Sequence, residues 1–451
     1  MKQLAKHQRY ASNMMDWVEF LAIWYEAGTG KTMCVLDYLY RAAERGEIKN
    51  ALVVCPSSMV GSWQRAIPKM LEFEGYTPEG VQRLEEIVTV VGFPMLYTST
   101  INRHINEKGE EVKDREVYLR EQVDHEWDVM VVDESHCIGS HSSVQTGVCL
   151  TLGSMSKRRY ILSGTPVSGG KGREDFQKLF GQLKFLDDGV FKNWTQFCRR
   201  YVTSEDRWHK PASYDVEACR ELMKQYGIVA RLADCYDMPD YTDTLVPCML
   251  MEPTVYDNMR KGILTKYGIK GMLKRSAGGQ YIRMLQVCSG HLKINDTDRL
   301  ELRTSKLEVL KDVLAGTDDK VVVFCNFRAS IEQTVRAVAK WGYSCVVFDG
   351  QSTTETWREF QEGDAHVLIC QYQAGGVGID LYASATMVLY EPCLSSLLLE
   401  QTRARIMRKG QTRHCRYMYL TTIGTIEDKI WEKVRSGVDV TREMLDEWAK
   451  E

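Results

Sequence analysis

The first candidate for chemistry is a glycine-rich segment, residues 26–32, which reads Glu-Ala-Gly-Thr-Gly-Lys-Thr. It follows a short apolar run and precedes a stretch of helical character, residues 32–41. Glycines let backbone N–H groups turn towards phosphate oxygens, and the amino terminus of a helix adds a favourable partial charge. This context predicts a phosphate-binding loop built on Gly28, Thr29 and Gly30, whereas the alternative is a glycine-rich turn with a surface lysine.

Two side chains of this loop have predicted roles in binding a nucleoside triphosphate. Lys31 would pair with the β- and γ-phosphates, and the Thr32 hydroxyl would bind Mg²⁺. One position departs from the pattern G-x-x-x-x-G-K-[ST], because Tyr25 stands where the first glycine is expected.

A pair of carboxylates follows a later apolar run. Residues 128–132 lead directly into Asp133 and Glu134. A buried strand that ends there would deliver both carboxylates to the same sheet edge as the phosphate-binding loop. Asp133 would hold Mg²⁺, directly or through water, and Glu134 would orient and deprotonate the attacking water. An Asp-Glu pair in a solvated loop is the alternative.

Positive charge for the far side of the γ-phosphate is available near the end of the chain. Residues 401–411 contain Arg405 and Arg408, which are three positions apart and would share one face of a helix. Their guanidinium groups would clamp the γ-phosphate as arginine fingers, which are worth roughly 10³–10⁵ in rate. A basic surface helix is the alternative for this segment.

Two series of short apolar runs are available to position these side chains. The first series comprises residues 20–24, 51–55, 87–91, 128–132 and 159–163. The second series comprises residues 320–325, 344–348, 366–370, 386–390 and 416–420. Such runs are typical of strands buried on both faces of a parallel sheet, and stretches of helical period lie between them. These two series therefore predict an α/β fold with two doubly wound parallel-sheet lobes.

The middle of the chain differs from both series, because it carries helical patterns and no regular strand pattern. We therefore expect lobe 1 over residues 1–166, a helical insert and linker over residues 167–304, and lobe 2 over residues 305–451. A glycine-rich patch at residues 277–279 predicts a loop within the insert.

The charge balance limits the ways in which the chain could bind nucleic acid. Lysines and arginines number 58 against 61 acidic residues, so the formal net charge is -3. This excludes a globally basic coat for nucleic acid, but local basic grooves act over a Debye length and stay open. Residues 261–283 are basic and contain no acidic residue. Lys270 and Lys274 in this strip are predicted to contact phosphates, and a solvated helix face is the alternative.

The 14 cysteines show no metal-binding spacing, since no two lie closer than the 12 positions between Cys137 and Cys149. Buried free thiols in a reducing compartment are therefore expected. We find neither a signal peptide nor an apolar run long enough to span a membrane. The sequence predicts a soluble intracellular protein with no membrane partner.

Taken together, these motifs resemble those of the superfamily 2 helicase motors, and most closely their Swi/Snf branch. The matches in the first lobe are residues 7–8, 25–32, 54–58 with Trp63, 133–136 and 162–166. The matches in the second lobe are residues 322–328, 349–352, 374–381, 400–411 and 425–430. Any one motif is weak, but the ordered set is specific to this family.

The resemblance implies two RecA-like lobes that hold ATP and Mg²⁺ between them, with nucleic acid across both. Gln8 would read the adenine, and Gly378 and Asp380 would contribute to the nucleotide site. Arg408 matches the arginine finger of the family. The residues that would contact nucleic acid, in addition to the basic strip, are Pro56, Ser57 and Arg328.

Two motifs depart from the pattern of the branch. Its motif V usually has Ser-Thr where this chain has Gln371 and Tyr372. Its motif VI usually has Asp and His where this chain has Ala404 and Met407. The threonine of motif V normally touches a phosphate of the nucleic acid, so the resemblance leaves the efficiency of stepping open.

The resemblance implies an ATP-dependent translocase on double-stranded DNA that remodels DNA or protein–DNA complexes without separating the strands. A strand-separating DNA or RNA helicase and an ATP-gated nucleic-acid clamp are the alternatives. We expect a monomer, with replication or repair proteins as candidate partners. The expected location is cytoplasmic or nucleoid-associated, or nuclear in a eukaryote, and the compact form would also suit a viral gene.

Overall fold

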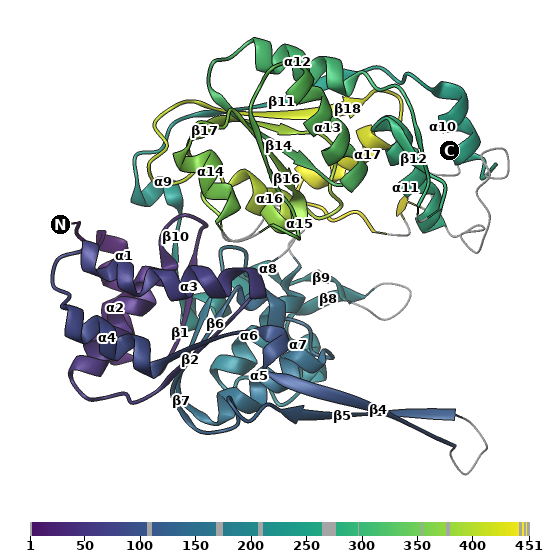
Figure 1. Cartoon of the computed structure of the whole chain (residues 1–451). Helices are drawn as coiled ribbons and strands as arrows, with labels where there is room; N and C mark the ends of the chain where they lie inside the picture. The colour runs from purple at the N-terminus through teal and green to yellow at the C-terminus, as the bar shows by residue number, and fades with distance from the viewer. Residues whose placement is uncertain are drawn as a thin grey trace. The chain divides into compact units, whose positions relative to one another are not determined.

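The computed structural model describes residues 2–105, 111–167, 175–205, 211–263, 277–295, 297–352, 355–375, 379–441, 444–445 and 448. These residues form two units, which are described separately. The first unit ends at Asp237 and the second begins at Met238. Figure 1 shows a sheet flanked by helices in each unit.

The first unit is built on a six-stranded sheet in which every neighbouring pair of strands is parallel. Its strands are β1 (Phe20–Tyr25), β2 (Ala51–Cys55), β3 (Val88–Gly92), β6 (Trp127–Asp133), β7 (Ser156–Leu162) and β10 (Gly227–Ala230). Their order in the sheet is β10-β1-β7-β6-β2-β3. The structure confirms every strand of the first predicted series.

Helices cover both faces of this sheet, as its alternating side chains require. In β1, Leu21 and Ile23 join one buried cluster, whereas Ala22 and Trp24 join another. The helices are α1 (Lys6–Trp17), α2 (Lys31–Glu44), α3 (Val60–Ala66), α4 (Pro78–Ile87), α5 (Val144–Ser154), α6 (Leu179–Leu186), α7 (Trp194–Tyr201), α8 (Val216–Tyr226) and α9 (Leu232–Cys235). Burial on both faces explains the unbroken apolar runs of these strands.

Two antiparallel hairpins are attached to the first unit. Strands β4 (Tyr97–Ile105) and β5 (Glu111–Leu119) pair along their whole length. Figure 1 shows them as a long ribbon that extends away from the sheet and its helices. The shorter hairpin consists of β8 (Val202–Glu205) and β9 (Pro211–Tyr214).

The second unit contains another six-stranded sheet of parallel pairs, in the order β11-β18-β17-β14-β16-β15. The strands are β11 (Tyr241–Cys248), β14 (Lys320–Cys325), β15 (Cys345–Phe348), β16 (Val367–Gln371), β17 (Ser384–Leu389) and β18 (Cys415–Thr422). The structure confirms every strand of the second predicted series and with it the predicted fold class.

Helices and one hairpin surround the second sheet. The helices are α10 (Pro253–Arg260), α11 (Ala277–Cys288), α12 (Lys306–Ala315), α13 (Arg328–Lys340), α14 (Thr356–Glu362), α15 (Tyr372–Gly375), α16 (Ser396–Arg403) and α17 (Ile426–Arg435). The hairpin pairs β12 (His291–Lys293) with β13 (Arg299–Glu301).

The structure corrects the prediction of a strand-free middle. Strand β10 extends the first sheet and β11 extends the second, so the chain of residues 167–304 is divided between the two units. Both are edge strands of mixed burial: β10 has only four residues, and β11 carries polar residues along its first half, so neither shows a long apolar run. The loop predicted at residues 277–279 is also wrong, because this patch begins α11.

The cysteines fit a further expectation of the sequence. All the cysteines are free thiols, and most are buried. Among the described residues, no group of three or more His, Cys, Asp or Glu side chains is arranged to hold a metal ion. No helix formed by these residues is long and apolar enough to cross a membrane.

Candidate nucleotide-binding site

The predicted phosphate-binding loop joins β1 to α2 in the backbone conformation that its glycines permit. Gly28 and Gly30 have φ angles of 86° and 84°, in the left-handed region that other residues rarely adopt. Gly30 precedes the first residue of α2, and a Cβ at this position would lie 2.1 Å from Nε2 of Gln8. The positive φ favours glycine at position 30, and a larger residue there would also displace the Gln8 amide.

Lys31 is held at the carboxyl end of β1. Its Nζ donates hydrogen bonds to the carbonyl oxygens of Tyr25 (2.9 Å) and Glu26 (3.4 Å). A Cβ on Gly164, in the segment that follows β7, would lie 3.6 Å from the same Nζ. The ammonium group thus lies between the ends of two neighbouring strands.

Helix α1 fixes the loop from the other side. Gln8 Nε2 donates to the carbonyl oxygen of Thr29 (3.1 Å), and Nε2 of His7 lies 2.8 Å from the same oxygen. The other end of the Gln8 amide accepts a hydrogen bond from the Ala5 N–H (3.0 Å). Gln8 therefore links helix and loop, while its predicted contact with adenine stays a prediction.

The carboxylate of Asp133 is buried at the end of β6, with 2% of the residue exposed. It accepts hydrogen bonds from Nε1 of Trp63 and from the N–H of Glu134, both at 2.8 Å. Burial, and then the charge of Glu134, raise the pKa of Asp133 to about 6, and the charge of Lys31 opposes this rise. Lys31 follows β1 and Asp133 ends β6, so both groups lie at the carboxyl edge of the same sheet.

Glu134 has a strained backbone. Its φ is 50°, and it is the one residue other than glycine with a positive φ in the described part of the chain. A left-handed conformation of this kind costs of order 1–3 kcal/mol and is common at functional sites. Its Oε2 lies 3.3 Å from Nδ1 of His136. Burial opposes protonation of His136, but hydrogen bonds with Cys137 and Glu134 outweigh it and raise its pKa to about 9.

Three strand ends meet at this edge of the first sheet. Leu162 of β7 is paired with Ile23 of β1 on one side and with Asp133 of β6 on the other. Ser163, just beyond Leu162, accepts a hydrogen bond from the Thr165 N–H (3.1 Å) and lies 3.4 Å from Nδ1 of His136. The expectation that the carboxylates and the phosphate-binding loop share one edge is confirmed.

Pro56 and Ser57 follow β2, two strands away from β7 in the sheet. Ser57 is exposed at the start of a 3₁₀ turn, η1 (Ser57–Met59), and packs against Gly92 at the end of β3. A Cβ on Gly92 would lie 2.7 Å from the Ser57 hydroxyl oxygen. The predicted contacts of Pro56 and Ser57 with nucleic acid stay predictions.

In the second unit, a buried carboxylate supports the segment that leads into α13. Glu391, which is 1% exposed, accepts hydrogen bonds from the backbone N–H groups of Asn326 (2.6 Å) and Phe327 (3.1 Å) and from the Ser330 hydroxyl. Arg328, the predicted nucleic-acid contact, is exposed as the first residue of α13. Sequence reasoning missed Glu391, although it stands two residues after the buried strand β17.

The two candidate arginine fingers do not share a helical face, because α16 ends at Arg403. Arg405 is buried and donates to the carbonyl oxygens of Gln401 (2.9 Å) and Ile379 (3.2 Å). Arg408 is half-buried and forms an ion pair with Asp380. The prediction of a shared face is therefore wrong, and Arg408 is the more accessible of the two guanidinium groups.

Several predicted residues are not placed by the structure or do not face solvent. Lys270, Lys274 and Gly378 lie outside the described residues. Arg283, at the end of the predicted basic strip, is buried on α11 and donates to the carbonyl oxygen of Gly279 (3.2 Å). Arg283 is therefore not a phosphate contact of the kind that the strip predicts.

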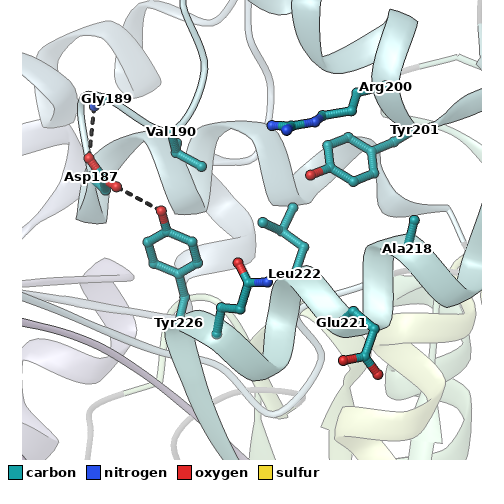
Figure 2. A pocket seen from close by; sticks show the side chains of 10 residues that line it. Asp187, Gly189, Val190, Arg200, Tyr201, Ala218, Glu221, Leu222 and Tyr226 are labelled. Atoms are coloured by element: carbon teal, nitrogen blue, oxygen red, sulfur yellow. Dashed lines mark hydrogen bonds between the residues drawn. The ribbon is translucent and has the colours of Figure 1, made fainter.

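A separate pocket of ≈ 510 Å³ lies in the first unit, where α6 and α8 end (Figure 2). The Tyr226 hydroxyl donates to Asp187 (2.7 Å), and the Gly189 N–H donates to the same carboxylate (2.8 Å). The lining residues are Asp187, Gly189, Val190, Arg200, Tyr201, Ala218, Glu221, Leu222, Gln225 and Tyr226. None of them belongs to the predicted nucleotide site.

The fold and the site together define this chain as an α/β protein. Its parallel strands end in loops that carry polar side chains, as those of ligand-binding α/β proteins do. Two family models then match the chain. The SNF2-related domain matches residues 23–259, and the helicase conserved C-terminal domain matches residues 305–410. The chain belongs to the SNF2-related family.

Similar proteins include two from yeasts. The DNA repair protein rhp54 of Schizosaccharomyces pombe is 24% identical over 94% of this chain and 55% of its own length. The DNA repair and recombination protein RAD54 of Saccharomyces cerevisiae is 23% identical over 90% of this chain and 51% of its own length. The chain thus spans about half the length of the curated relatives it matches.

Among solved structures, the Sulfolobus solfataricus SWI2/SNF2 ATPase core in complex with dsDNA is 18% identical to this chain. The match covers 98% of this chain and 92% of that one, with a TM-score of 0.41.

Proposed function

We propose that this chain is an ATP-dependent translocase on double-stranded DNA, which hydrolyses ATP to move along DNA and remodel DNA or protein–DNA complexes. The observation that carries the proposal is the meeting of Lys31, Asp133 and Glu134 at one edge of a parallel sheet, in a chain of the SNF2-related family. The similar yeast proteins are named for DNA repair, which supports DNA as the partner.

In this proposal the first unit binds the phosphates of ATP. Backbone N–H groups of Gly28, Thr29 and Gly30 surround phosphate oxygens, and Lys31 exchanges its carbonyl partners for the β- and γ-phosphates. Two of the groups from which Nζ would move are neutral carbonyl oxygens at the start of the same loop.

Glu134 is the proposed general base. It orients the attacking water and accepts its proton, which requires a carboxylate held in a fixed position. Its left-handed backbone and its contact with His136 supply that fixed position. The nearby Asp133 is poorly suited to this role, because both of its oxygens already accept hydrogen bonds.

Thr32 and Asp133 fit a role in holding Mg²⁺. This cation prefers oxygen ligands and is commonly bound by one or two carboxylates together with substrate phosphates. Asp133 is buried, which raises its pKa, and a nearby cation would stabilise its ionised form. Bound Mg²⁺ would neutralise charge on the β- and γ-phosphates.

The second unit contributes Arg408 in this proposal, as an arginine finger directed at the γ-phosphate. In the structure its guanidinium pairs with Asp380, and its Nε donates to the carbonyl oxygen of Ala404 (3.0 Å). Arg405 would act less directly, because its buried hydrogen bonds to backbone carbonyls hold the adjoining segment. Arg328, Pro56 and Ser57 are the proposed contacts with DNA on the two units.

A clamp that binds DNA without moving is the second candidate, and Tyr372 favours it. Tyr372 occupies the position at which the Swi/Snf branch usually has a threonine that contacts a phosphate of the nucleic acid. Its side chain is fully buried and its hydroxyl donates to the Glu391 carbonyl (2.8 Å), so it belongs to the packing of the second unit. The loss of this contact with DNA would weaken translocation along DNA more than binding to DNA.

The proposal is tested by the rate of ATP hydrolysis with duplex DNA, single-stranded DNA and RNA. Stimulation by duplex DNA above the other two is expected, and equal or greater stimulation by single strands would favour a strand-separating helicase. Displacement of a third strand from a DNA triplex then separates movement from clamping. DNA-stimulated hydrolysis without displacement would replace the translocase with the clamp.

A further inference from the structure

Helix α6 packs unusually closely against the turn that carries Glu134. This turn, η4 (Ser135–Ile138), begins immediately after Glu134. A Cβ on Gly181 of α6 would lie 2.0 Å from the carbonyl oxygen of Ile138, and a Cβ on Gly139 would lie 2.6 Å from Cβ of Lys178. The backbones approach this closely only because both positions are glycine.

Gln182 makes a polar link across the same contact. Both Gln182 and Ser135 are 0% exposed. The Ser135 hydroxyl donates to Oε1 of Gln182 (2.7 Å), and Nε2 of Gln182 donates to the carbonyl oxygens of Pro166 (2.8 Å) and Lys178 (3.1 Å). One buried amide therefore joins the turn after β6 to the segment after β7.

The hydrogen-bond partners determine the orientation of this amide. The carbonyl oxygens of Pro166 and Lys178 can only accept, so the amide NH₂ must face them. The amide oxygen must then face Ser135, whose hydroxyl can donate. Every polar atom of the side chain is used, which rigidifies a buried network of this kind.

We propose that Gln182 is a positioning residue for hydrolysis, which holds the Glu134 turn in register with residues 163–166 at the adjacent strand end. Ser135 is covalently next to the proposed base, and Pro166 closes the segment whose Gly164 packs against Lys31. The inference rests on the proposed function, because it assigns the support for the base that this function requires. Gln182 itself touches none of the reacting groups.

The test compares Gln182→Met and Ser135→Ala with the unsubstituted chain. Methionine has a similar length and volume but offers no comparable hydrogen bond. We expect each variant to lower the DNA-stimulated kcat by about 10- to 100-fold, since a misplacement of about 1 Å costs up to ~10²-fold. KM for ATP should change by less than about twofold, because the loop that binds phosphates is untouched.

A double variant and a matched control distinguish positioning from general damage. Gln182→Met together with Ser135→Ala should lower kcat no further than the more severe single variant, because both changes remove the same link. Gln82→Met, at an exposed position of α4, should leave kcat unchanged. Additive losses in the double variant, or an equal loss in the control, would overturn the proposal.

Hydrogen exchange tests the same link without relying on activity. In nucleotide-free protein, amide exchange of residues 134–139 should be at least about tenfold faster in Gln182→Met, with little change at β2 or β3. Unchanged exchange, or uniformly faster exchange throughout the first unit, would refute the positioning role.

The outcomes for the two proposals differ. If the unsubstituted chain shows no DNA-dependent hydrolysis, the proposed function fails, while the exchange experiment still decides the role of Gln182. If the chain is active, Glu134→Gln is inactive and Gln182→Met keeps full kcat, the positioning role alone fails.

Discussion

The two sheets share an all-parallel design but use the polar side chains at their carboxyl edges in opposite ways. In the first unit, Asp133 is buried with a raised pKa and Glu134 has a strained backbone. In the second unit, Glu391 is buried too, but it accepts hydrogen bonds from the backbone N–H groups of Asn326 and Phe327. The edge of the first sheet thus contains a buried carboxylate and a strained backbone. The edge of the second sheet instead uses its buried carboxylate to pair backbone N–H groups.

This difference suggests a division of roles between the two edges. Buried charge and left-handed backbone persist only where the surrounding structure maintains them, and they are common at functional sites. Saturated hydrogen bonds, in contrast, fix the conformation of the segments that contain them. The sequence patterns of both edges look alike, so the division becomes visible only from the contacts.

Residues 408–411 of the second unit also hold backbone in place, at the start of β17. Gln411 is buried and donates to the carbonyl oxygens of Ser384 (2.7 Å), Tyr382 (3.2 Å) and Ile406 (3.2 Å). Gly410 has a φ of 102°, which lets the chain turn sharply after Arg408. These two residues shape the segment that presents the arginine.

The largest expected effect would separate the two arginines. Arg408→Ala should lower kcat by roughly 10³–10⁵, the value of an arginine finger, with little change in melting temperature. Arg405→Ala should lower the melting temperature, because buried carbonyls lose their donor. Steady-state hydrolysis and thermal unfolding of both variants provide the measurement. Equal melting temperatures in the two variants would contradict the structural role that distinguishes Arg405 from Arg408.

The next effect concerns Glu134, the proposed general base. Glu134→Gln should lower kcat by about 10²–10⁴, the usual contribution of a general base, while ATP still binds. Binding of a fluorescent ATP analogue and single-turnover hydrolysis measure the two properties. Near-normal turnover would assign the base to another residue.

A third prediction concerns the buried ion pair between Lys306 and Glu427 in the second unit. Both side chains are 0% exposed and their charged atoms are 2.6 Å apart. Lys306→Met should lower the free energy of unfolding by about 3–5 kcal/mol, because it leaves an unpaired buried carboxylate. Adding Glu427→Gln, which keeps an acceptor for the Thr422 N–H, should recover most of that loss. Denaturant unfolding of both variants checks this, and a double variant no more stable than Lys306→Met would contradict it.

The smallest expected effect is the pH dependence that His136 gives to the first unit. Its folded pKa of about 9 exceeds the usual 6.5, so its protonated form stabilises the fold. This contribution is complete below about pH 6.5 and is lost as the pH rises through 9. The difference in free energy of unfolding between the chain and His136→Gln should therefore shrink by roughly 1–3 kcal/mol from pH 6 to pH 9.5. A constant difference would show that His136 is not charged in the folded state.

The strands of both predicted series and the helix after the phosphate-binding loop could be predicted because each depends on local signals. Buried strands such as β2 and β14 need apolar residues on both faces, and this requirement appears as an unbroken run. The strands β10 and β11 escaped prediction because edge strands lack that requirement. Their pairing partners lie far away along the chain, and no local pattern specifies them.

The site divides in the same way. The loop at residues 26–32 and the pair Asp133-Glu134 were found because their residue types and order reflect the chemistry directly. Gln182, Trp63 and Glu391 act through hydrogen bonds to residues more than 60 positions away or across a helix contact. When a buried amide or carboxylate lies within an apolar stretch, the sequence does not reveal which residue will be its hydrogen-bond partner.

The sequence by itself determined that there are two parallel sheets and where most of their strands lie, and it supplied the candidate side chains for binding a nucleoside triphosphate. Local composition suffices for these features, since period, glycine content and strand-end carboxylates are properties of short segments. Only the tertiary structure decided that Arg405 supports its backbone, that Arg408 pairs with Asp380 and that Gln182 joins two strand ends. Those roles depend on which distant groups approach within hydrogen-bonding distance, and packing alone determines that.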